Sequence, residues 1–271
     1  MSEGRGLTEA IQEAAERARS VGALDLLDSE VEVHEDGGVP FHLRVLRPST
    51  AKRNGKASTH RAPRPTQRLS PPDPQLHVRD VGDRHHVVLK KRPVLQNHAL
   101  IVTKDFEEQE SLLTEEDIGA ANHVLEETDG LLYYNAGAMA GASLRHKHMQ
   151  IVHLPIGDGP QRTPVDRVVG RGSLPFVHAV ASWDSRASVC FRRYRALLSA
   201  IDRDRDGAPY NLLMTRDWML AVPRTIERFA GMSVNALSYA GSLLTRDRSE
   251  LTTIKSAGPW RVLSQVAVGV G

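Results

Sequence analysis

Three histidines, a glutamine and a serine fall within one short stretch of the chain, residues 141–153, which reads GASLRHKHMQIVH. If this stretch is a β-strand, the alternation of its side chains places His146, His148 and Gln150 on one face. Lys147 then points to the opposite face. The first face would present a row of polar groups to a single pocket.

A zinc site is one chemistry that such a row could serve. It would need a further Cys, His or carboxylate ligand close to His146 and His148. The third place on the face is held by Gln150, and an amide is a poor ligand for zinc. His153 has the opposite parity, and Cys190 is the only cysteine in the chain. The residues therefore predict no metal site in this row.

Nucleophilic catalysis at phosphorus fits the row better. An imidazole can attack phosphorus and carry the transferred group, which divides one difficult displacement into two easier ones. We expect His148 to be the nucleophile because it is central in the row, with its second ring nitrogen held by an acceptor. Gln150 can donate its amide hydrogens to a phosphoryl oxygen. The small residues 137–143 allow backbone amides to approach a phosphate closely. A single histidine here would more often be structural, but the shared parity beside this loop favours the functional interpretation.

The elements around the row predict an α+β fold. The hydrophobic patterns indicate helices over residues 7–27, 114–127, 187–201 and 250–257, and strands over 31–33, 41–45, 85–89, 98–103, 131–134, 145–154, 210–215 and 219–222. Thr114 followed by Asp117 is an approximate helix-capping pattern. Strands in hairpins, with helices outside them, favour an antiparallel sheet with flanking helices over a parallel one.

Composition and charge narrow the class of protein. The 271 residues carry 35 Lys and Arg against 33 Asp and Glu, a net charge of +2, which does not suggest a nucleic-acid coat or a membrane-surface protein. The single cysteine and the lack of a long apolar run predict a soluble cytoplasmic protein. Residues 48–74 are rich in Pro, Arg, Lys, Ser and Thr, and we expect them to form a mobile basic loop.

At the histidine row the sequence resembles the histidine triad superfamily, in the branch that has His, any residue, His, any residue, Gln. The context YNAGAMAGASLRHKHMQIV is similar to the diadenosine tetraphosphate (Ap4A) phosphorylases, also called ATP adenylyltransferases. Further similar blocks are STAK ending at Lys52, LKKRPVLQNHALIVTKDFEEQE, YNLLMTRDWMLAVPR and SVNALSYAGSLLTR. The resemblance covers most of the chain outside the proline-rich loop, and it implies a histidine-triad-like antiparallel sheet.

The resemblance also implies roles for individual residues. The catalytic set would be His148 as the adenylylated nucleophile, Gln150 at the phosphate and His146 beside them. The substrate-binding set would be Lys52, Lys91, Asn135, Gly141, Ala142, Ser143, Leu144, Asn235, Ala236, Leu237, Ser242 and Arg246. The family more usually has Leu-Asn-Lys at residues 89–91, where this chain has Leu-Lys-Lys, so a ribose contact by Lys90 does not carry over directly. Residues 1–160 would form the catalytic part, and residues 161–271 would complete the same sheet and nucleotide site.

The implied reaction is attack of His148 on an α-phosphorus of Ap4A, release of ATP, and phosphorolysis of the adenylyl-histidine to ADP. Neutral glutamine at position 150 cannot take a proton from water, so the intermediate would wait for phosphate. Lys52, Lys91 and Arg246 could neutralise the polyphosphate. No cofactor is required, although Mg²⁺ on the substrate is compatible with this chemistry. The partners would be a nucleotide and inorganic phosphate, and the enzyme would be a monomer or a homodimer.

Two alternatives to a phosphorylase stay open at this point. One is another enzyme of the same superfamily, such as a dinucleoside polyphosphate hydrolase or a sugar-phosphate nucleotidylyltransferase. The other is a non-catalytic nucleotide sensor that keeps the pocket without turnover.

Overall fold

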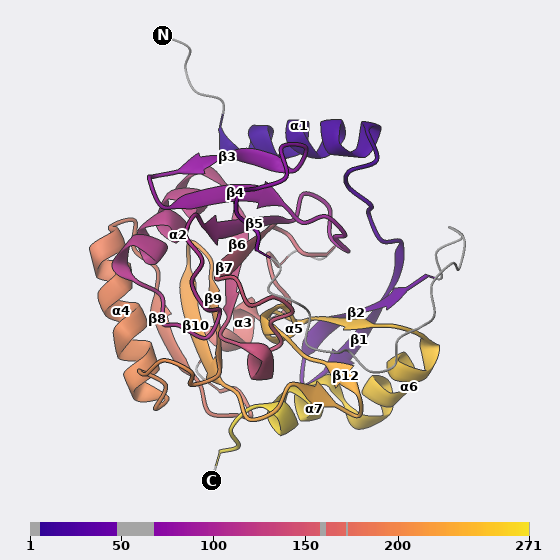
Figure 1. The fold of residues 1–271 in the computed structure, drawn as a ribbon. Helices are drawn as coiled ribbons and strands as arrows, with labels where there is room; N and C mark the ends of the chain where they lie inside the picture. The colour runs from indigo at the N-terminus through magenta and orange to yellow at the C-terminus, as the bar shows by residue number, and fades with distance from the viewer. Residues whose placement is uncertain (1–5, 48–67, 158–160, 172, 271) are drawn as a thin grey trace.

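The computed structural model describes residues 6–47, 68–157, 161–171 and 173–270, which centre on a large antiparallel sheet (Figure 1). Its strands run in the order β3-β4-β5-β7-β6-β9-β10-β8. They are β3 (His77–Val81), β4 (His85–Leu89), β5 (Ala99–Thr103), β6 (Gly130–Asn135), β7 (His148–His153), β8 (Ala179–Ser182), β9 (Tyr210–Met214) and β10 (Trp218–Pro223). Strand β7, which holds most of the histidine row, lies in the middle of the sheet between β5 and β6.

Three helices cover one face of this sheet: α1 (Leu7–Ser20), α2 (Glu115–Glu127) and α4 (Ala187–Ala200). Their apolar sides pack on side chains of the sheet, among them Met149 and Ile151 of β7. Because side chains alternate along a strand, His148 and Gln150 point to the other face. The expected division between an apolar and a polar face of this strand is confirmed.

The other face carries a second core beneath a three-stranded sheet and short helices. The sheet consists of β1 (Ser29–Asp36), β2 (Val39–Leu46) and β13 (Ser242–Thr245), with β13 parallel to β2. Around it lie α5 (Ala236–Tyr239), near the centre of Figure 1, and α6 (Arg248–Ala257) and α7 (Pro259–Val266), toward its lower right. Four shorter elements complete the described fold: η1 (Ala138–Ala140), α3 (Asp166–Val169), β11 (Arg228–Phe229) and β12 (Met232–Ser233).

The predicted α+β class with an antiparallel sheet and flanking helices is confirmed. Within α2, the expected cap is present, because the Thr114 hydroxyl accepts from Asp117 N at 3.2 Å and Asp117 Oδ2 accepts from Thr114 N at 2.8 Å. The expected hairpins formed by β1 and β2, β6 and β7, and β9 and β10 are also present.

Several predicted boundaries were wrong, and two of them bear on the site. Helix α1 ends at Ser20 rather than near residue 27, because Gly22 has a φ of +71° and the chain then runs beside the β4–β5 connection. There Asp25 N donates to Lys91 O at 2.9 Å and so leaves the helical hydrogen-bonding pattern. Strand β7 begins at His148 rather than at residue 145, so His146 precedes the strand.

The expected basic loop and three strands remain to be compared with the structure. Most of the expected basic loop, residues 48–67, lies outside the described residues. Residues 68–74, its last part, contain no helix or strand in the structure. Strands β3, β8 and β13 were not predicted from the sequence. Within the described ranges, none of the helices has both the length and the apolar character that a membrane span needs.

Candidate active site

His148 is held at the start of β7 in one orientation and one tautomer. Its Nδ1 lies 2.7 Å from the main-chain oxygen of His146, an acceptor, so Nδ1 carries the proton and donates it. The lone pair of the imidazole is therefore on Nε2. This arrangement matches the requirement for a nucleophile whose second nitrogen is anchored to the main chain.

Burial keeps the His148 imidazole neutral. The side chain is buried, and this burial lowers the pKa of His148 from 6.5 to about 4, opposed by the hydrogen bond to His146 O. The positive charge of Lys90 lowers the pKa further. At neutral pH the ring is thus uncharged, which is the form that can attack phosphorus.

Gln109 fixes the backbone of His148 from the opposite side. Its Oε1 accepts from His148 N at 2.8 Å, and its Nε2 donates to His148 O at 3.0 Å and to Asn135 O at 2.9 Å. Gln109 is buried, so these bonds are shielded from water. One side chain therefore joins His148 to the end of β6.

Gln150, two residues along β7, has an amide of fixed orientation. Its Oε1 accepts from His98 Nε2 at 2.9 Å, from the Tyr133 hydroxyl at 3.1 Å and from Lys90 Nζ at 3.4 Å. With these donors converging on the oxygen, the NH₂ group points away from them and is left to donate to a ligand. Burial lowers the pKa of Lys90 to about 8, so this lysine keeps most of its charge at neutral pH and loses it as the pH rises through about 8.

His146 is fixed by main-chain hydrogen bonds and in turn orients His148. Its Nδ1 accepts from Leu69 N at 2.9 Å, and its Nε2 lies 3.2 Å from Asp105 O, to which it donates. Both ring nitrogens are therefore engaged by main-chain groups. Its carbonyl oxygen is the acceptor that orients His148.

The small-residue loop after β6 contacts the turn before α5. Gly141 has a φ of +90°, and a Cβ atom added there would lie 2.6 Å from Val234 O and 2.8 Å from Asn235 Cβ. Asn235 caps α5 by accepting from Leu237 N at 3.1 Å. Two blocks that the resemblance implied for the substrate, residues 141–144 and 235–237, are thus brought together.

Asn135 joins these blocks to β9. Its Oδ1 accepts from Ala236 N at 2.9 Å and from Asn211 Nδ2 at 2.8 Å, and Asn211 is also its partner across the β6–β9 pair. The Asn135 side chain therefore positions the loop and the turn.

Arg224 forms hydrogen bonds to the same loop and to the segments next to it. It is buried, and its Nη1 donates to Asn211 Oδ1 at 2.7 Å and to Val234 O at 2.9 Å. The same nitrogen lies 3.3 Å from Ala140 O. A single guanidinium thus links η1, β9 and the segment before α5.

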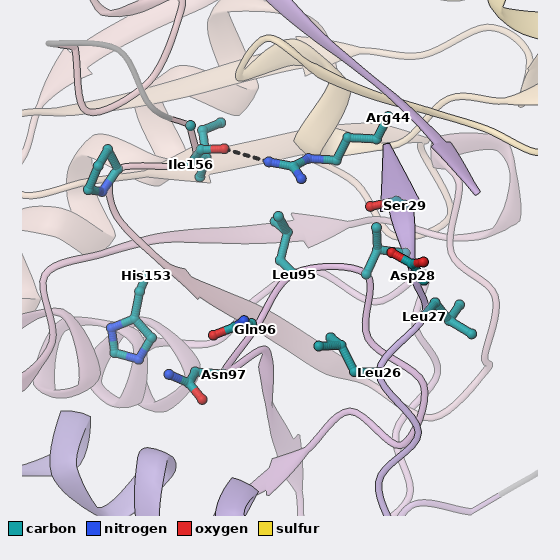
Figure 2. Close-up of a pocket in the computed structure, with 13 residues that line it drawn as sticks. Leu26, Leu27, Asp28, Ser29, Arg44, Leu95, Gln96, Asn97, His153 and Ile156 are labelled. Carbon is teal, nitrogen blue, oxygen red and sulfur yellow. Dashed lines mark hydrogen bonds between the residues drawn. The ribbon is translucent and has the colours of Figure 1, made fainter. Parts of the chain in front are cut away.

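A cavity of about 820 Å³ lies at the other end of β7 (Figure 2). His153, Gln96, Asn97 and Leu95 line one part of it, and Arg44 lies across from them, donating to Ile156 O at 2.8 Å. Its volume is within the range of about 300–1,000 Å³ that is usual for small-molecule sites. The segment that carries Gln96 and Asn97 leads directly into His98, which contacts Gln150.

Two family models match the sequence of this chain. The model described as "Ap4A phosphorylase N-terminal domain" matches residues 1–171, and the model described as "ATP adenylyltransferase C-terminal domain" matches residues 172–269. Together they cover almost the whole chain. This chain belongs to the Ap4A phosphorylase family.

Relatives of known structure and sequence lie in the same family. Diadenosine 5',5'''-P1,P4-tetraphosphate phosphorylase 2 of Saccharomyces cerevisiae is 28% identical in an alignment 230 residues long, and the alignment covers 68% of this chain and 70% of the yeast protein. Protein APA1 of the same yeast is 27% identical in an alignment 198 residues long, and the alignment covers 60% of this chain and 62% of that protein. The crystal structure of yeast Ap4A phosphorylase Apa2 in complex with Ap4A superimposes with a TM-score of 0.78 at 24% identity and 98% coverage of both chains. This likeness confirms the expected histidine-triad-like fold.

The remaining residues that the family resemblance singled out are scattered. Ser242 is buried and its hydroxyl accepts from Arg44 Nε at 3.1 Å, in the small sheet. The Arg246 side chain is 69% exposed and is paired with Glu250. The Lys91 side chain is exposed, whereas its neighbour Lys90 contacts Gln150. Lys52 lies outside the described residues.

Sequence reasoning missed several members of the site, among them Gln109, His98, Tyr133 and Arg224. Tyr133 and His98 could have been found, because each lies in or beside a strand with the parity of Gln150. Gln109 and Arg224 had no signal of this kind, since each contacts residues far away in the chain.

Proposed function

We propose that this member of the Ap4A phosphorylase family converts Ap4A and inorganic phosphate to ATP and ADP through an adenylyl-histidine at His148. The observation that carries the proposal is the hydrogen bond from His148 Nδ1 to the carbonyl of His146, which leaves the lone pair on Nε2. Attack by Nε2 on an α-phosphorus forms a nitrogen–phosphorus bond and breaks the bond to the bridging oxygen, so ATP leaves. Attack of phosphate on the same phosphorus then releases ADP and restores the imidazole.

In this proposal, Gln150 explains why phosphate rather than water attacks the adenylyl-histidine. Its amide can donate to a phosphoryl oxygen but cannot accept a proton from water, so hydrolysis of the intermediate lacks a general base at this position. Lys90 Nζ, 3.4 Å from Gln150 Oε1, supplies positive charge that an incoming phosphate dianion requires. Magnesium would enter with the polyphosphate, and the enzyme acts in the cytoplasm as a monomer or homodimer.

The deciding experiment is to trap the intermediate. The protein is mixed with Ap4A labelled at the α-phosphates, without inorganic phosphate, quenched in base and separated from free nucleotide. We expect an acid-labile label on the wild-type chain and none on His148→Ala. The matched control is His123→Ala, which removes an exposed imidazole that lies on helix α2, away from the cavity and the histidine row. Equal labelling of His148→Ala and wild type would show that another residue is the nucleophile.

Product analysis separates the proposal from its alternatives. With phosphate present, we expect ADP and ATP in equal amounts, and in its absence we expect little AMP. Release of AMP at the same rate without phosphate would identify a hydrolase. Nucleotide binding without adduct or products would identify a sensor.

We also propose that one adenosine of the substrate lies in the cavity at the end of β7. The cavity is lined by apolar side chains such as Leu95 and by polar groups that include Asn97, and its wall continues into His98. Leu95→Trp should fill part of this space and raise the KM for Ap4A about 10-fold, the effect of losing roughly 1.4 kcal/mol of binding. The adduct at His148 should still form at saturation. The control is Leu244→Trp at an exposed leucine, and an unchanged KM in Leu95→Trp would place the adenosine elsewhere.

A further inference from the structure

Outside the candidate active site, two histidines and an aspartate converge at the edge of the large sheet. His77 Nε2 lies 3.0 Å from Asp80 Oδ1, and His86 Nδ1 lies 2.7 Å from the same oxygen. All three ligand atoms lie within 4.8 Å of one another. The two imidazole rings are nearly perpendicular, with centroids 5.5 Å apart.

A β-bulge brings these three residues to one face. Asp80 and His86 are direct partners across the β3–β4 pair, but His77 is three residues before Asp80 and would point to the opposite face of a regular strand. The pairing shifts register between His77 and Arg79, which inserts one extra residue there. The convergence therefore depends on a local irregularity of this edge strand.

The donor set has the chemistry of a transition-metal site. Two imidazoles and one carboxylate, with an open position for water, are a usual ligand set for zinc and related divalent ions. Ligand atoms about 2.0 Å from a tetrahedral ion lie about 3.3 Å from one another, so small side-chain movements would be enough. Access is open, since the side chains of His77, Asp80 and His86 are 33%, 46% and 14% exposed.

We propose that His77, Asp80 and His86 bind a divalent transition-metal ion of the zinc class at the β3–β4 hairpin. The ion would link the edge strand β3 to β4 through three protein ligands and keep at least one position open to solvent. Strand pairing fixes the position of this site relative to His148. His86 of β4 lies opposite Val102 of β5, and Val102 lies opposite His148 of β7. The site thus shares a face with His148, which lies two strand spacings, about 10 Å, from His86 and three strand spacings, about 14 Å, from Asp80.

Lys104 provides a sharp test of this assignment. Its Nζ lies 2.7 Å from Asp80 Oδ2, the oxygen that does not contact the histidines. An ammonium group at this distance repels a metal ion on the other oxygen. If the cluster binds metal, Lys104→Met should tighten the binding several-fold. If the four side chains form only an ion-pair network, the same change removes a partner of Asp80 and creates no metal affinity.

The experiment uses the full chain, free of any purification tag and stripped of metal with a chelator. Titration with Zn²⁺ is followed by calorimetry, and Co²⁺ is added separately to read the coordination geometry from its visible absorption. We expect one equivalent to bind, with Kd at least 10-fold weaker in His86→Ala and Asp80→Asn. Zinc should raise the Tm of the wild type but not that of these variants, since only a protein that binds the ion is stabilised.

The control is His123→Ala, because His123 is an exposed histidine paired with a carboxylate, Glu127, at 2.8 Å. This variant should keep the full stoichiometry. The Tm of each variant without metal shows whether it folds. The proposal is overturned if the wild type binds no zinc, or if His86→Ala and Asp80→Asn bind as tightly as wild type. In the latter case His148→Ala would locate the ion in the histidine row.

Discussion

The His148 side chain has two properties that the proposed mechanism needs. Its imidazole stays neutral well below the usual pKa of histidine, and its ring is held in one orientation. Burial disfavours the imidazolium, and the hydrogen bond to His146 O directs the lone pair on Nε2. The neighbouring Lys90 keeps a positive charge within reach of Gln150. In the mechanism we propose, the reactive form of the site requires a neutral His148 and a charged Lys90 together.

This requirement predicts a bell-shaped dependence of kcat/KM on pH. Protonated His148 cannot attack, so activity should fall as the pH decreases through about 4, well below the usual histidine value of 6.5. Neutral Lys90 cannot attract phosphate, so activity should fall again as the pH rises through about 8. Stopped-flow rates at limiting Ap4A would measure both limbs.

The Lys90 variants assign the alkaline limb. Lys90→Gln should lower kcat/KM roughly 10- to 100-fold at pH 7 and remove that limb, because the charged hydrogen-bond donor is lost. Lys90→Arg should restore part of the activity and move the limb to higher pH, since arginine stays charged. An alkaline limb that persists in Lys90→Gln would assign it to another group.

Gln109 should matter to catalysis although it does not touch the reacting ring. Gln109→Ala leaves His148 N and two carbonyl oxygens without their partner, which costs about 1–3 kcal/mol for each buried group. We expect lower stability in urea and a lower rate of adduct formation with little change in KM. Gln75→Ala, at an exposed glutamine, should change neither quantity. A rate equal to wild type would show that the ring anchor alone positions His148.

Among the structural elements, the loop 137–141 and the turn before α5 act as one unit. They come from different family domains, and they meet where Gly141 approaches Val234 O and Asn235. The left-handed conformation at Gly141 and the lack of a side chain both permit this approach. The position of the loop amides therefore depends on a contact with the distant turn.

Gly141→Ala should separate these two segments. An added Cβ would meet Val234 O at 2.6 Å, and at that distance the backbone has to move. We expect a higher KM for Ap4A and a loss of stability beyond the roughly 1 kcal/mol that a positive φ costs alanine. Gly207→Ala is the matched control, because Gly207 also has a positive φ, +76°, but its added Cβ would meet nothing within 4 Å. Equal effects of both changes on the KM would show that the contact does not shape the nucleotide site.

The sequence predicted the parts of the site that depend on local pattern. Alternation along one strand is sufficient to place His148 and Gln150 on a common face, and the structure has them there. The contacts of Gln109 join segments 26 and 39 residues apart, so no local pattern could reveal them. A one-residue step along the chain decides that Lys90 rather than Lys91 contacts Gln150, because neighbouring side chains diverge. The cluster of His77, Asp80 and His86 could not be predicted for a related reason, since only a bulge brings His77 to the same face as Asp80.

At the scale of the whole molecule, Arg224 connects the second core to the active-site loop. Its guanidinium donates to the carbonyl oxygens of Val266 at 3.0 Å and Ile226 at 2.8 Å, in addition to Val234 and Asn211. It also lies 5.7 Å from the centre of the Tyr239 ring. The Arg224 guanidinium thereby connects β9, the segment before α5 and the end of α7 through hydrogen bonds.

Arg224→Met should destabilise the protein strongly, by about 3–5 kcal/mol, because several buried acceptors lose their donor together. Arg224→Lys should recover little of this loss, since an ammonium cannot reach acceptors in the directions of a planar guanidinium. Urea unfolding monitored by tryptophan fluorescence gives the free energies. Arg228→Met, at an exposed arginine four residues later, should stay within about 0.5 kcal/mol of wild type. A small effect of Arg224→Met would mean that water replaces the guanidinium.

The pairing of β6 with β9 joins the two family domains within one continuous sheet. Neither domain closes its own sheet, because the edge of β6 in the first is completed only by β9 in the second. Two polypeptides made by cutting between the domains would each carry an open strand edge and half of the Asn135–Asn211 pair. Such fragments would regain a nucleotide site only on meeting each other, which makes this chain a natural scaffold for a split reporter of molecular association.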